Sequence, residues 1–435
     1  MALKKIDYAR PVYIVEGCRT PFLKARGKPG PFKHAELAIQ SSRSLLERMP
    51  FEPDLLDEVI YGTVMPGTDE ANISRIIALR VGCGDQVPAY TVQRNCASGM
   101  QSLDNAALSI ADGRSDLILA GGVEAMSRAP VLWNEKLLHW LSDWSSNKTL
   151  LSRVKLLPQF RLAFLSPVSA LLNGLTDPVI GMSMGETAEK IAHRFNITRE
   201  LMDQYAAQSH QRLHQAQQSG LLDEITPIFD HQGRLYDHDD GVRPDSTMDK
   251  LAKLTPAFDK PFGLVTPGNS SQISDGAVSL ILASADAVEK FQLPVLARLV
   301  STHWAGVAAD EMGLGPAHAI SALLRSRRLK VDSIDAWEIN EAFAAQVLAV
   351  LEALKDKSYC KDHLGLRSAI GEIPMERLNL HGGGISLGHP VGASGARIVL
   401  HLAKVLQQSD AKRGIASLCI GGGQGGAMLI ERESS

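Results

Sequence analysis

Short apolar runs alternate with longer stretches of helical periodicity along the first 126 residues. The pattern predicts strands at 12–15, 59–61, 90–94 and 116–120, and helices at 35–49, 72–79 and 97–111. Strand, helix and strand in this order favour parallel pairing through a right-handed crossover. We therefore expect an α/β unit whose last strand ends at Gly121-Gly122.

The pattern returns in the last third of the chain, with a strand at 277–283 and a second α/β region from about 296 to 430. Ala97-Ser98-Gly99 recurs there as Ala393-Ser394-Gly395, and the Gly121-Gly122 pair recurs as Gly421-Gly422. Self-similarity of this kind indicates two copies of one βα unit.

The segment between these regions has a different character. Residues 131–172 carry Trp133, Trp140 and Trp144 at helical spacing, with lysines and arginines close by. Such a pattern is typical of an interfacial membrane helix or a partner-docking helix, and the alternative is a helical hairpin packed on the protein's own surface. Two more helices are predicted at 186–195 and 198–220.

Histidine and aspartate cluster at residues 237–240, within a polar stretch from 230 to 250. These residue types at close spacing would suit a metal ion, but they are mostly found exposed. We expect a solvated loop there and no metal site.

Composition limits the class of protein. The 435 residues predict two or three domains, and a net charge of −3 argues against wholesale nucleic-acid binding. The five cysteines show no CxxC pairing, so neither a disulfide framework nor a zinc site is indicated. No signal peptide or transmembrane run is recognisable, and we expect a cytoplasmic protein.

Cys96 lies at the predicted junction between a strand and a helix, where unpaired backbone N–H groups favour a thiolate. The alternative is that it is a small buried packing residue. If the two copies pack with their strand ends together, Asn340, His389 and Cys419 meet Cys96. A histidine base, an amide donor and a second thiol would then surround a nucleophile.

Two other glycine patterns were weighed. Residues 421–426 match GxGxxG, but too little chain follows for the βαβ unit of a dinucleotide fold, so NAD binding is rejected. Residues 181–185 match GxSxG, yet no convincing strand precedes them, and a serine hydrolase is only a minor alternative.

Five motifs together resemble those of thiolases, and they occur in that family's order: Asn95-Cys96-Ala97-Ser98-Gly99, Met184-Gly185-Glu186-Thr187-Ala188-Glu189, Asn340-Glu341-Ala342-Phe343, Gly388-His389-Pro390-Val391-Gly392-Ala393-Ser394-Gly395 and Cys419-Ile420-Gly421-Gly422-Gly423. The resemblance implies a five-layered αβαβα fold with an inserted, mainly helical loop domain. Its halves would be residues 1–127 with 273–295 and residues 296–435, with the loop domain at 128–272.

The resemblance also implies roles for single residues. Cys96 would accept the acyl group, His389 would activate it, and Cys419 would protonate the leaving enolate. Asn340, holding a water beside His389, would form one oxyanion site, and the backbone N–H groups of Cys96 and Gly421 would form the other.

Coenzyme A is implied as a substrate, with no metal and no tightly bound cofactor. Ser271 and Arg243 occupy positions where the family contacts coenzyme A, and Met184 would line the acyl channel. Gln272 stands where a glycine commonly follows the serine, so this chain departs from the family pattern beside that contact.

The implied activity is ping-pong thiolysis of medium- and long-chain 3-ketoacyl-CoA in fatty-acid β-oxidation. The insertion at about 131–172 is similar to that of β subunits of bacterial trifunctional fatty-acid oxidation complexes. This similarity implies a homodimer core in a heterotetramer with a hydratase/dehydrogenase α subunit, and leaves peripheral membrane contact open. A β-ketoacyl synthase is disfavoured by Cys419, and a non-catalytic subunit by the intact set of four residues.

Overall fold

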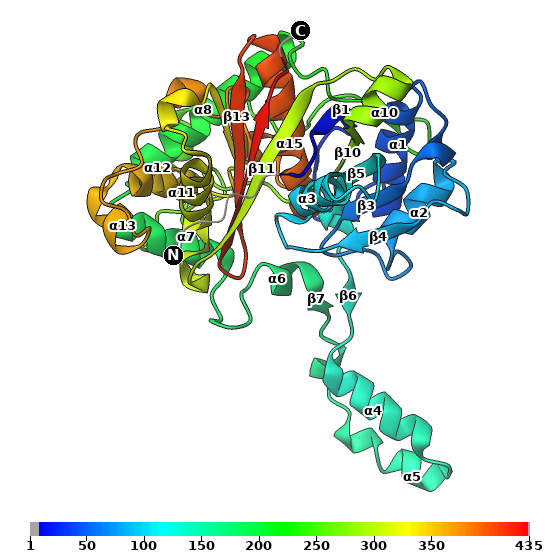
Figure 1. Ribbon diagram of the computed structural model, residues 1–435. Coiled ribbons are helices and arrows are strands. Elements are labelled where there is room, and N and C mark those ends of the chain that lie inside the picture. Colours follow the sequence, from blue (N-terminus) through cyan, green and yellow to red (C-terminus); the bar gives the residue numbers. More distant parts are fainter. Residues whose placement is uncertain (1–7, 434–435) are drawn as a thin grey trace.

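A ten-stranded mixed sheet runs through the computed structural model, which describes residues 8–433 (Figure 1). Its spatial order is β12-β13-β14-β11-β1-β10-β5-β3-β4, and β2 pairs with β10. The strands are β1 (Val12–Arg19), β2 (Leu23–Lys24), β3 (Glu58–Gly62), β4 (Ala89–Val92), β5 (Leu117–Ala125), β10 (Ser274–Ser284), β11 (Ala297–Gly306), β12 (Ala336–Ile339), β13 (Arg413–Ile420) and β14 (Gln424–Glu431). All the strands predicted from the apolar runs are present.

The sheet consists of two halves that meet at β1 and β11. These strands pair antiparallel over a short register, from Val12 opposite Leu299 to Ile14 opposite Ala297. Within the halves, β3 pairs parallel with β4 and β5, and β12 pairs parallel with β13. The expected parallel units are therefore confirmed, and antiparallel strands join them.

Helices form the other three layers. Helices α3 (Ser98–Ala111) and α15 (Val391–Gln408) lie between the half-sheets, while α1 (His34–Leu46) with α2 (Ile73–Arg80) and α11 (Gly315–Arg327) with α12 (Ala344–Lys355) cover the outer faces (Figure 1). Separate buried apolar clusters fill the two outer interfaces and the central one. The predicted αβαβα layering is confirmed.

Small residues let the two central helices approach closely. A Cβ atom on Gly99 would lie 2.8 Å from the Ala396 backbone nitrogen, and one on Gly395 would lie 2.6 Å from that of Met100. The recurring Ala-Ser-Gly motif thus marks the place where the two copies touch.

Strand β5 continues past the glycine pair at which we expected it to end. Residues Leu117 to Ala125 are all buried, because helices cover both faces of this part of the sheet. A Cβ atom on Gly122 would lie 2.2 Å from the Gly392 carbonyl oxygen. The glycines permit this close approach and do not form a turn, so the expected strand end is wrong.

Most of the remaining elements lie in or beside the inserted segment. They are β6 (Val131–Leu132), α4 (Glu135–Ser146), α5 (Leu150–Val154), β7 (Val168–Ser169), α6 (Ala170–Gly174), α7 (Met184–Arg194), α8 (Arg199–Gln218), β8 (Ile228–Phe229), β9 (Leu235–Tyr236), α9 (Met248–Leu251), α10 (Ala285–Phe291), α13 (Lys357–Asp362) and α14 (Gly384–Leu387). The predicted helices at 186–195 and 198–220 correspond to α7 and α8. The proposed limits of the three domains stay a prediction.

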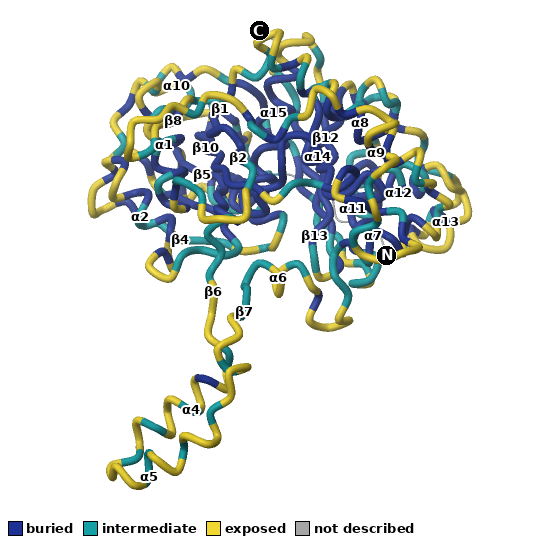
Figure 2. The backbone as a smooth tube through the Cα atoms, turned by 180° about the vertical axis from the view of Figure 1, so that it is seen from behind, coloured by how far each residue is buried: buried dark blue, intermediate teal, exposed yellow. Residues whose placement is uncertain are grey.

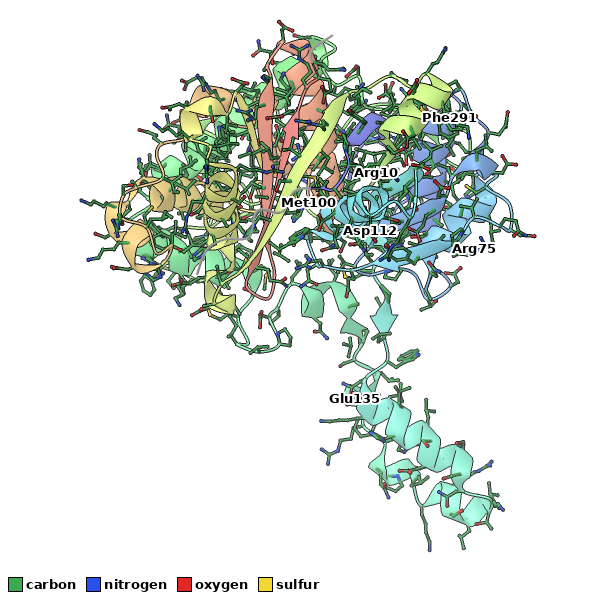
Figure 3. All side chains as sticks on the ribbon, in the orientation of Figure 1. Arg10, Arg75, Met100, Asp112, Glu135 and Phe291 are labelled. Atoms are coloured by element: carbon green, nitrogen blue, oxygen red, sulfur yellow. The ribbon has the colours of Figure 1, made fainter. Side chains whose placement is uncertain are left out.

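Residues 131–169, which we call the arm, project from the body of the molecule (Figures 1 and 2). Strands β6 and β7 pair at its base, and Glu135 marks the start of its long helix in Figure 3. Trp140 stacks on Trp144 at 5.3 Å and meets Phe160 at 5.0 Å between ring centroids. This part of the tryptophan stripe is therefore the arm's own small core.

No helix within residues 8–433 is long and apolar enough to cross a membrane.

The expectation of a solvated loop at 237–240 is wrong for Asp239. This carboxylate is fully buried and accepts two hydrogen bonds from the Arg19 guanidinium, at 2.7 and 2.8 Å. It also accepts a hydrogen bond from the Phe22 backbone N–H. Asp237 and His238 are exposed as expected, and no cluster within residues 8–433 has the side chains to hold a metal ion.

Candidate active site

Cys96 lies in a tight turn between β4 and α3, as the sequence predicts. Asn95 adopts a φ of +42°, and the Ala97 N–H donates to the Arg94 carbonyl oxygen at 2.9 Å. The Asn95 side chain donates to the Gly421 carbonyl oxygen at 2.8 Å. The turn from the first half of the chain is thereby tied to the β13–β14 turn of the second half.

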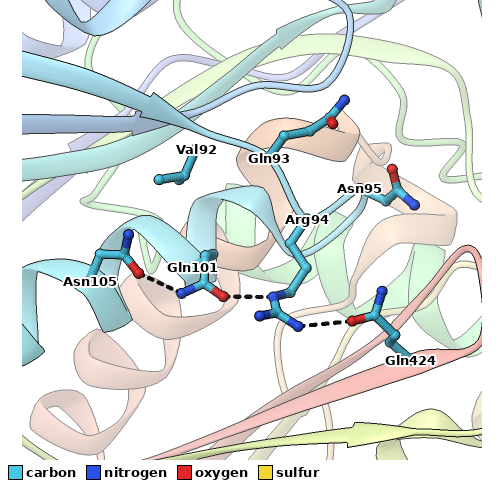
Figure 4. Close-up of a pocket in the computed structure, with 7 residues that line it drawn as sticks. All are labelled: Val92, Gln93, Arg94, Asn95, Gln101, Asn105 and Gln424. Carbon is cyan, nitrogen blue, oxygen red and sulfur yellow. Dashed lines mark hydrogen bonds between the residues drawn. The ribbon is translucent and has the colours of Figure 1, made fainter.

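Arg94 holds this turn on its other side. Its guanidinium donates to Gln101 and Gln424 (Figure 4). It also lies 4.4 Å from the centre of the Trp304 ring. The polar hollow around these side chains measures about 500 Å³. Its walls carry amides and a cation, and Cys96 lines a different cavity.

His389 is buried and neutral. Burial and the nearby Arg397 charge lower the pKa of His389 to about 4. Its Nδ1 lies 2.6 Å from the Ser394 hydroxyl, which itself donates to the Pro390 carbonyl oxygen at 3.0 Å. Because that hydroxyl proton is already used, Ser394 accepts the Nδ1 proton, and the lone pair is left on Nε2.

Asn340 directly follows β12 and contacts the same ring. Its Nδ2 lies 3.4 Å from both ring nitrogens of His389, and its backbone N–H donates to the Ser417 carbonyl oxygen. The buried Oδ1 has no hydrogen-bond partner among residues 8–433. An unpaired buried oxygen is costly, so it is available to a water or a ligand.

The two cysteines of the site are thiols at neutral pH. Burial raises the pKa of Cys96, although hydrogen bonding from the Gly421 N–H acts in the opposite direction. Burial and the proximity of Cys96 raise the pKa of Cys419 well above its ordinary value. The expected thiolate at Cys96 is therefore wrong for the unliganded protein, because loss of water outweighs the backbone dipoles.

Cys96 opens onto a mostly apolar cavity of about 230 Å³. Its lining combines the turn at Cys96, the β13–β14 turn and the chain that returns from the arm: Val64, Met65, Asn95, Cys96, Met126, Gly174, Leu175, Thr176, Asp177, Pro178, Val179, Met184, Val391, Gly421 and Gly422. Met184 lies on this wall, and its place in an acyl channel stays a prediction. Cys96 and Gly421 present adjoining parts of the same wall.

Ser271 and Arg243 do not line this cavity. The Ser271 backbone N–H donates to the Ala342 carbonyl oxygen, next to the segment that carries Asn340. Arg243 lies near Lys24, whose pKa is lowered by burial and by the charges of Arg243 and Arg26. This cluster of positive charge would suit phosphate groups, and the coenzyme A contacts stay predictions.

Two domain-family models match the chain. Residues 12–286 match the thiolase N-terminal domain, and residues 293–432 match the thiolase C-terminal domain. The chain belongs to the thiolase family. This thiolase is an acyltransferase.

Its relatives include two named types. The mitochondrial trifunctional enzyme subunit beta of Bos taurus is 37% identical over 97% of this chain and 88% of its own length. A probable acetyl-CoA acyltransferase of Staphylococcus epidermidis is 36% identical over 97% and 98%.

Two solved structures are similar throughout. Human mitochondrial 3-ketoacyl-CoA thiolase in complex with CoA has a TM-score of 0.84 and 34% identity over 99% of this chain and 100% of that one. The acetyl-CoA acetyltransferase of Syntrophomonas wolfei has a TM-score of 0.85 and 33% identity over 98% and 100%.

The GxSxG match in this thiolase has a structural role. Ser183 caps the N-terminus of α7, and its hydroxyl and the Glu186 carboxylate exchange hydrogen bonds with each other's backbone N–H groups. The spacing of serine and glutamate three residues apart was the sequence signal for this cap.

Sequence reasoning did not find what orients His389. Ser394 was noted only as part of a repeated helix start, although its spacing of five residues from the histidine was visible. The buried Glu124, which holds both the cavity wall and the turn after His389, was also missed.

Proposed function

We propose that this thiolase cleaves 3-ketoacyl-CoA by a ping-pong route through an acyl group on Cys96. The observation that carries the proposal is a cysteine thiol at an apolar cavity, with a buried neutral histidine and a second thiol from the other half of the chain. Cys419 lies near Cys96, and Val391, two residues after His389, lines the same cavity. These groups can supply a nucleophile, a base and an acid.

In the first half-reaction, His389 Nε2 takes the Cys96 proton and the sulfur attacks the 3-keto carbon. The bond between C2 and C3 then breaks, and its electron pair forms the enolate of acetyl-CoA. The Cys419 thiol protonates that enolate, so acetyl-CoA leaves and Cys419 becomes a thiolate. The raised pKa of Cys419 supports this role, because it keeps the proton available until the enolate forms.

In the second half-reaction, the Cys419 thiolate takes the proton of free coenzyme A, whose sulfur attacks the thioester on Cys96. Cys96 leaves and recovers its proton from His389. Both halves place negative charge on an oxygen. The backbone N–H groups of Cys96 and Gly421 are proposed donors for one such oxygen, and Asn340 with a water for the other.

We further propose medium- and long-chain substrates. The cavity wall carries three methionines, three valines and a leucine, whose side chains favour a hydrocarbon chain over a polar one. Part of that wall, residues 174–179, is the chain returning from the arm. No residue of the arm itself lines the cavity, so the inserted segment contributes to the wall only through residues beyond the arm.

The arm is also the proposed docking element for an α subunit that carries hydratase and dehydrogenase activities. Large apolar side chains on it remain exposed, among them Leu150 at 78%, Leu151 at 71% and Leu162 at 80%. The identity to trifunctional enzyme β subunits over nearly the whole chain supports a protein partner. Contact with lipid is the other outcome that a test can return.

The decisive experiment mixes purified protein with a long-chain 3-ketoacyl-CoA and free coenzyme A and follows acetyl-CoA. Wild type should form acetyl-CoA, and Cys96→Ala should lose activity by at least about a thousandfold, because the acyl acceptor is gone. Cys83→Ala, at a buried cysteine on the outer side of the sheet, is the matched control and should stay active. Absence of acetyl-CoA from wild type would refute the proposal.

A further inference from the structure

Glu124 is a fully buried carboxylate at the end of β5 that no step of the reaction uses. It accepts hydrogen bonds from the backbone N–H groups of Val64 at 2.9 Å, Met65 at 3.1 Å and Gly392 at 3.1 Å. One side chain therefore binds the backbone of two segments that lie far apart in the sequence.

Both segments form part of the site. Val64 and Met65 line the cavity beside Cys96, and Gly392 follows Val391, another lining residue, in the first turn of α15, three residues after His389. The Glu124 carboxylate thus fixes how far the cavity wall lies from the turn that carries the base.

The chain segments at this junction are closely packed. A Cβ atom on Gly392 would lie 2.4 Å from the Val123 carbonyl oxygen and 2.8 Å from Glu124 Oε2. The turn after His389 can approach β5 only because residue 392 has no side chain.

A buried histidine neutralises the carboxylate. His34 Nε2 lies 3.2 Å from Glu124, and His34 Nδ1 lies 3.2 Å from Glu70. Because each ring nitrogen faces a carboxylate, both carry protons, and the imidazolium stands between two negative charges. Burial alone would lower the pKa of His34. The hydrogen bonds and charges of Glu124 and Glu70 outweigh this effect and raise the pKa to about 9.

Glu70 occupies the far side of the same histidine. It accepts hydrogen bonds from the Ala35 N–H at 2.9 Å and the Gly67 N–H at 3.2 Å, and it is 4% exposed. It shares the burial and the partner of Glu124 but touches no residue of the cavity wall. Glu70 is therefore a matched control for Glu124.

We propose that Glu124 is a positioning residue that sets the acyl-chain preference of the enzyme by holding Val64 and Met65 at a fixed distance from the His389 turn, with His34 as its counter-charge. The inference rests on the proposed function, since it concerns the substrate of the same site.

The test is Glu124→Gln. Glutamine has nearly the same side-chain volume as glutamate, but its NH₂ group replaces one of the two acceptor oxygens. That group then faces backbone N–H donors, which are left without an acceptor. KM for a long-chain 3-ketoacyl-CoA should rise about tenfold, while KM for acetoacetyl-CoA, which barely reaches the wall, should stay within about twofold. Any fall in kcat should be equal for the two substrates, because the His389 turn serves both.

Glu70→Gln is the matched control and should leave the ratio of the two KM values unchanged. An unchanged ratio in Glu124→Gln, or an equal change in both variants, would overturn the proposal. If Glu124→Gln does not fold, His34→Gln takes its place. Loss of the counter-charge should shift the same ratio about threefold, and no shift would again overturn the proposal.

Amide hydrogen exchange separates this inference from the proposed function, because it needs no activity. Val64, Met65 and Gly392 should exchange faster in Glu124→Gln than in wild type, and Glu70→Gln should leave them unchanged. Exchange at wild-type rates in Glu124→Gln would refute the positioning role even if thiolysis were never observed.

Discussion

The orientation of His389 depends on a single hydroxyl in the next helical turn. Ser394 accepts the Nδ1 proton at 2.6 Å, while Asn340 contacts the ring from β12. The proposed base needs its lone pair on Nε2, and a neutral imidazole has two tautomers. The Ser394 hydroxyl selects one of them.

Ser394→Ala should therefore lower kcat by about ten- to a hundredfold with little change in KM, because His389 loses the partner that fixes its tautomer. Steady-state thiolysis measures this split. Ser386→Ala removes another buried hydroxyl from the same stretch, which bonds to Ser209 and Gly383 and not to His389, and it should keep kcat within about threefold. Equal losses in both variants would contradict the assignment.

At the scale of single residues, the structure shows two of the expected neighbours, Asn340 beside His389 and Cys419 near Cys96, but the sequence did not predict the protonation of these groups. Cys96, Asn340, His389 and Cys419 could be picked out because each occurs in a short motif at the end of a strand or in a turn. The state of Cys96 depends on how much water the assembled site excludes. That quantity is set by residues from both halves and has no local signature.

Among the elements, the arm differs most from its sequence reading. The helical spacing of its tryptophans was recognised, but two of them face the arm's own core, and the leucines around residue 150 are exposed instead. Periodicity locates an apolar face, whereas the identity of the surface that covers it depends on how the hairpin folds back.

Leu150→Ser with Leu151→Ser should weaken co-purification with an α subunit at least about tenfold, because both substitutions remove apolar surface that a partner would bury. Short-chain thiolysis should stay within about twofold. Leu55→Ser with Leu79→Ser, at exposed leucines on the body, is the control. Deleting residues 133–165 should abolish the association.

Flotation of each variant with anionic phospholipid vesicles completes this test. Loss of vesicle binding with retained co-purification would assign the arm to lipid and overturn the α-subunit proposal. If the variants bind the α subunit and the vesicles as well as wild type does, the arm has neither the docking role nor the lipid-binding role.

Across the whole molecule, a buried ion pair fastens the inserted segment to the sheet. Arg19, at the end of β1, pairs with Asp239 at 2.7 Å and with Glu224 at 3.3 Å, and all three side chains are at most 1% exposed. The sequence did not reveal this contact, because Asp239 stands in a run of polar residues and its partner lies in another element.

Asp239→Asn should lower the free energy of unfolding by about 3 kcal/mol, since it leaves the buried Arg19 charge short of a partner. Chemical denaturation measures the loss. Asp237→Asn, two residues away at an exposed carboxylate that bonds only to its neighbour His238, should change stability by less than about 1 kcal/mol. A comparable loss in both variants would contradict the role of the pair.

The burial of α15 has a consequence for how the two halves relate. Every residue from Val391 to Leu406 is buried, and the helix packs against α3 and β5 of the first half as well as β12 and β13 of the second. The division between the two matched domains, at residues 286 to 293, is thus not a boundary between independent cores, because the central core is shared. Either half alone would keep its outer cluster but expose its side of the central interface, so the two halves depend on each other for folding.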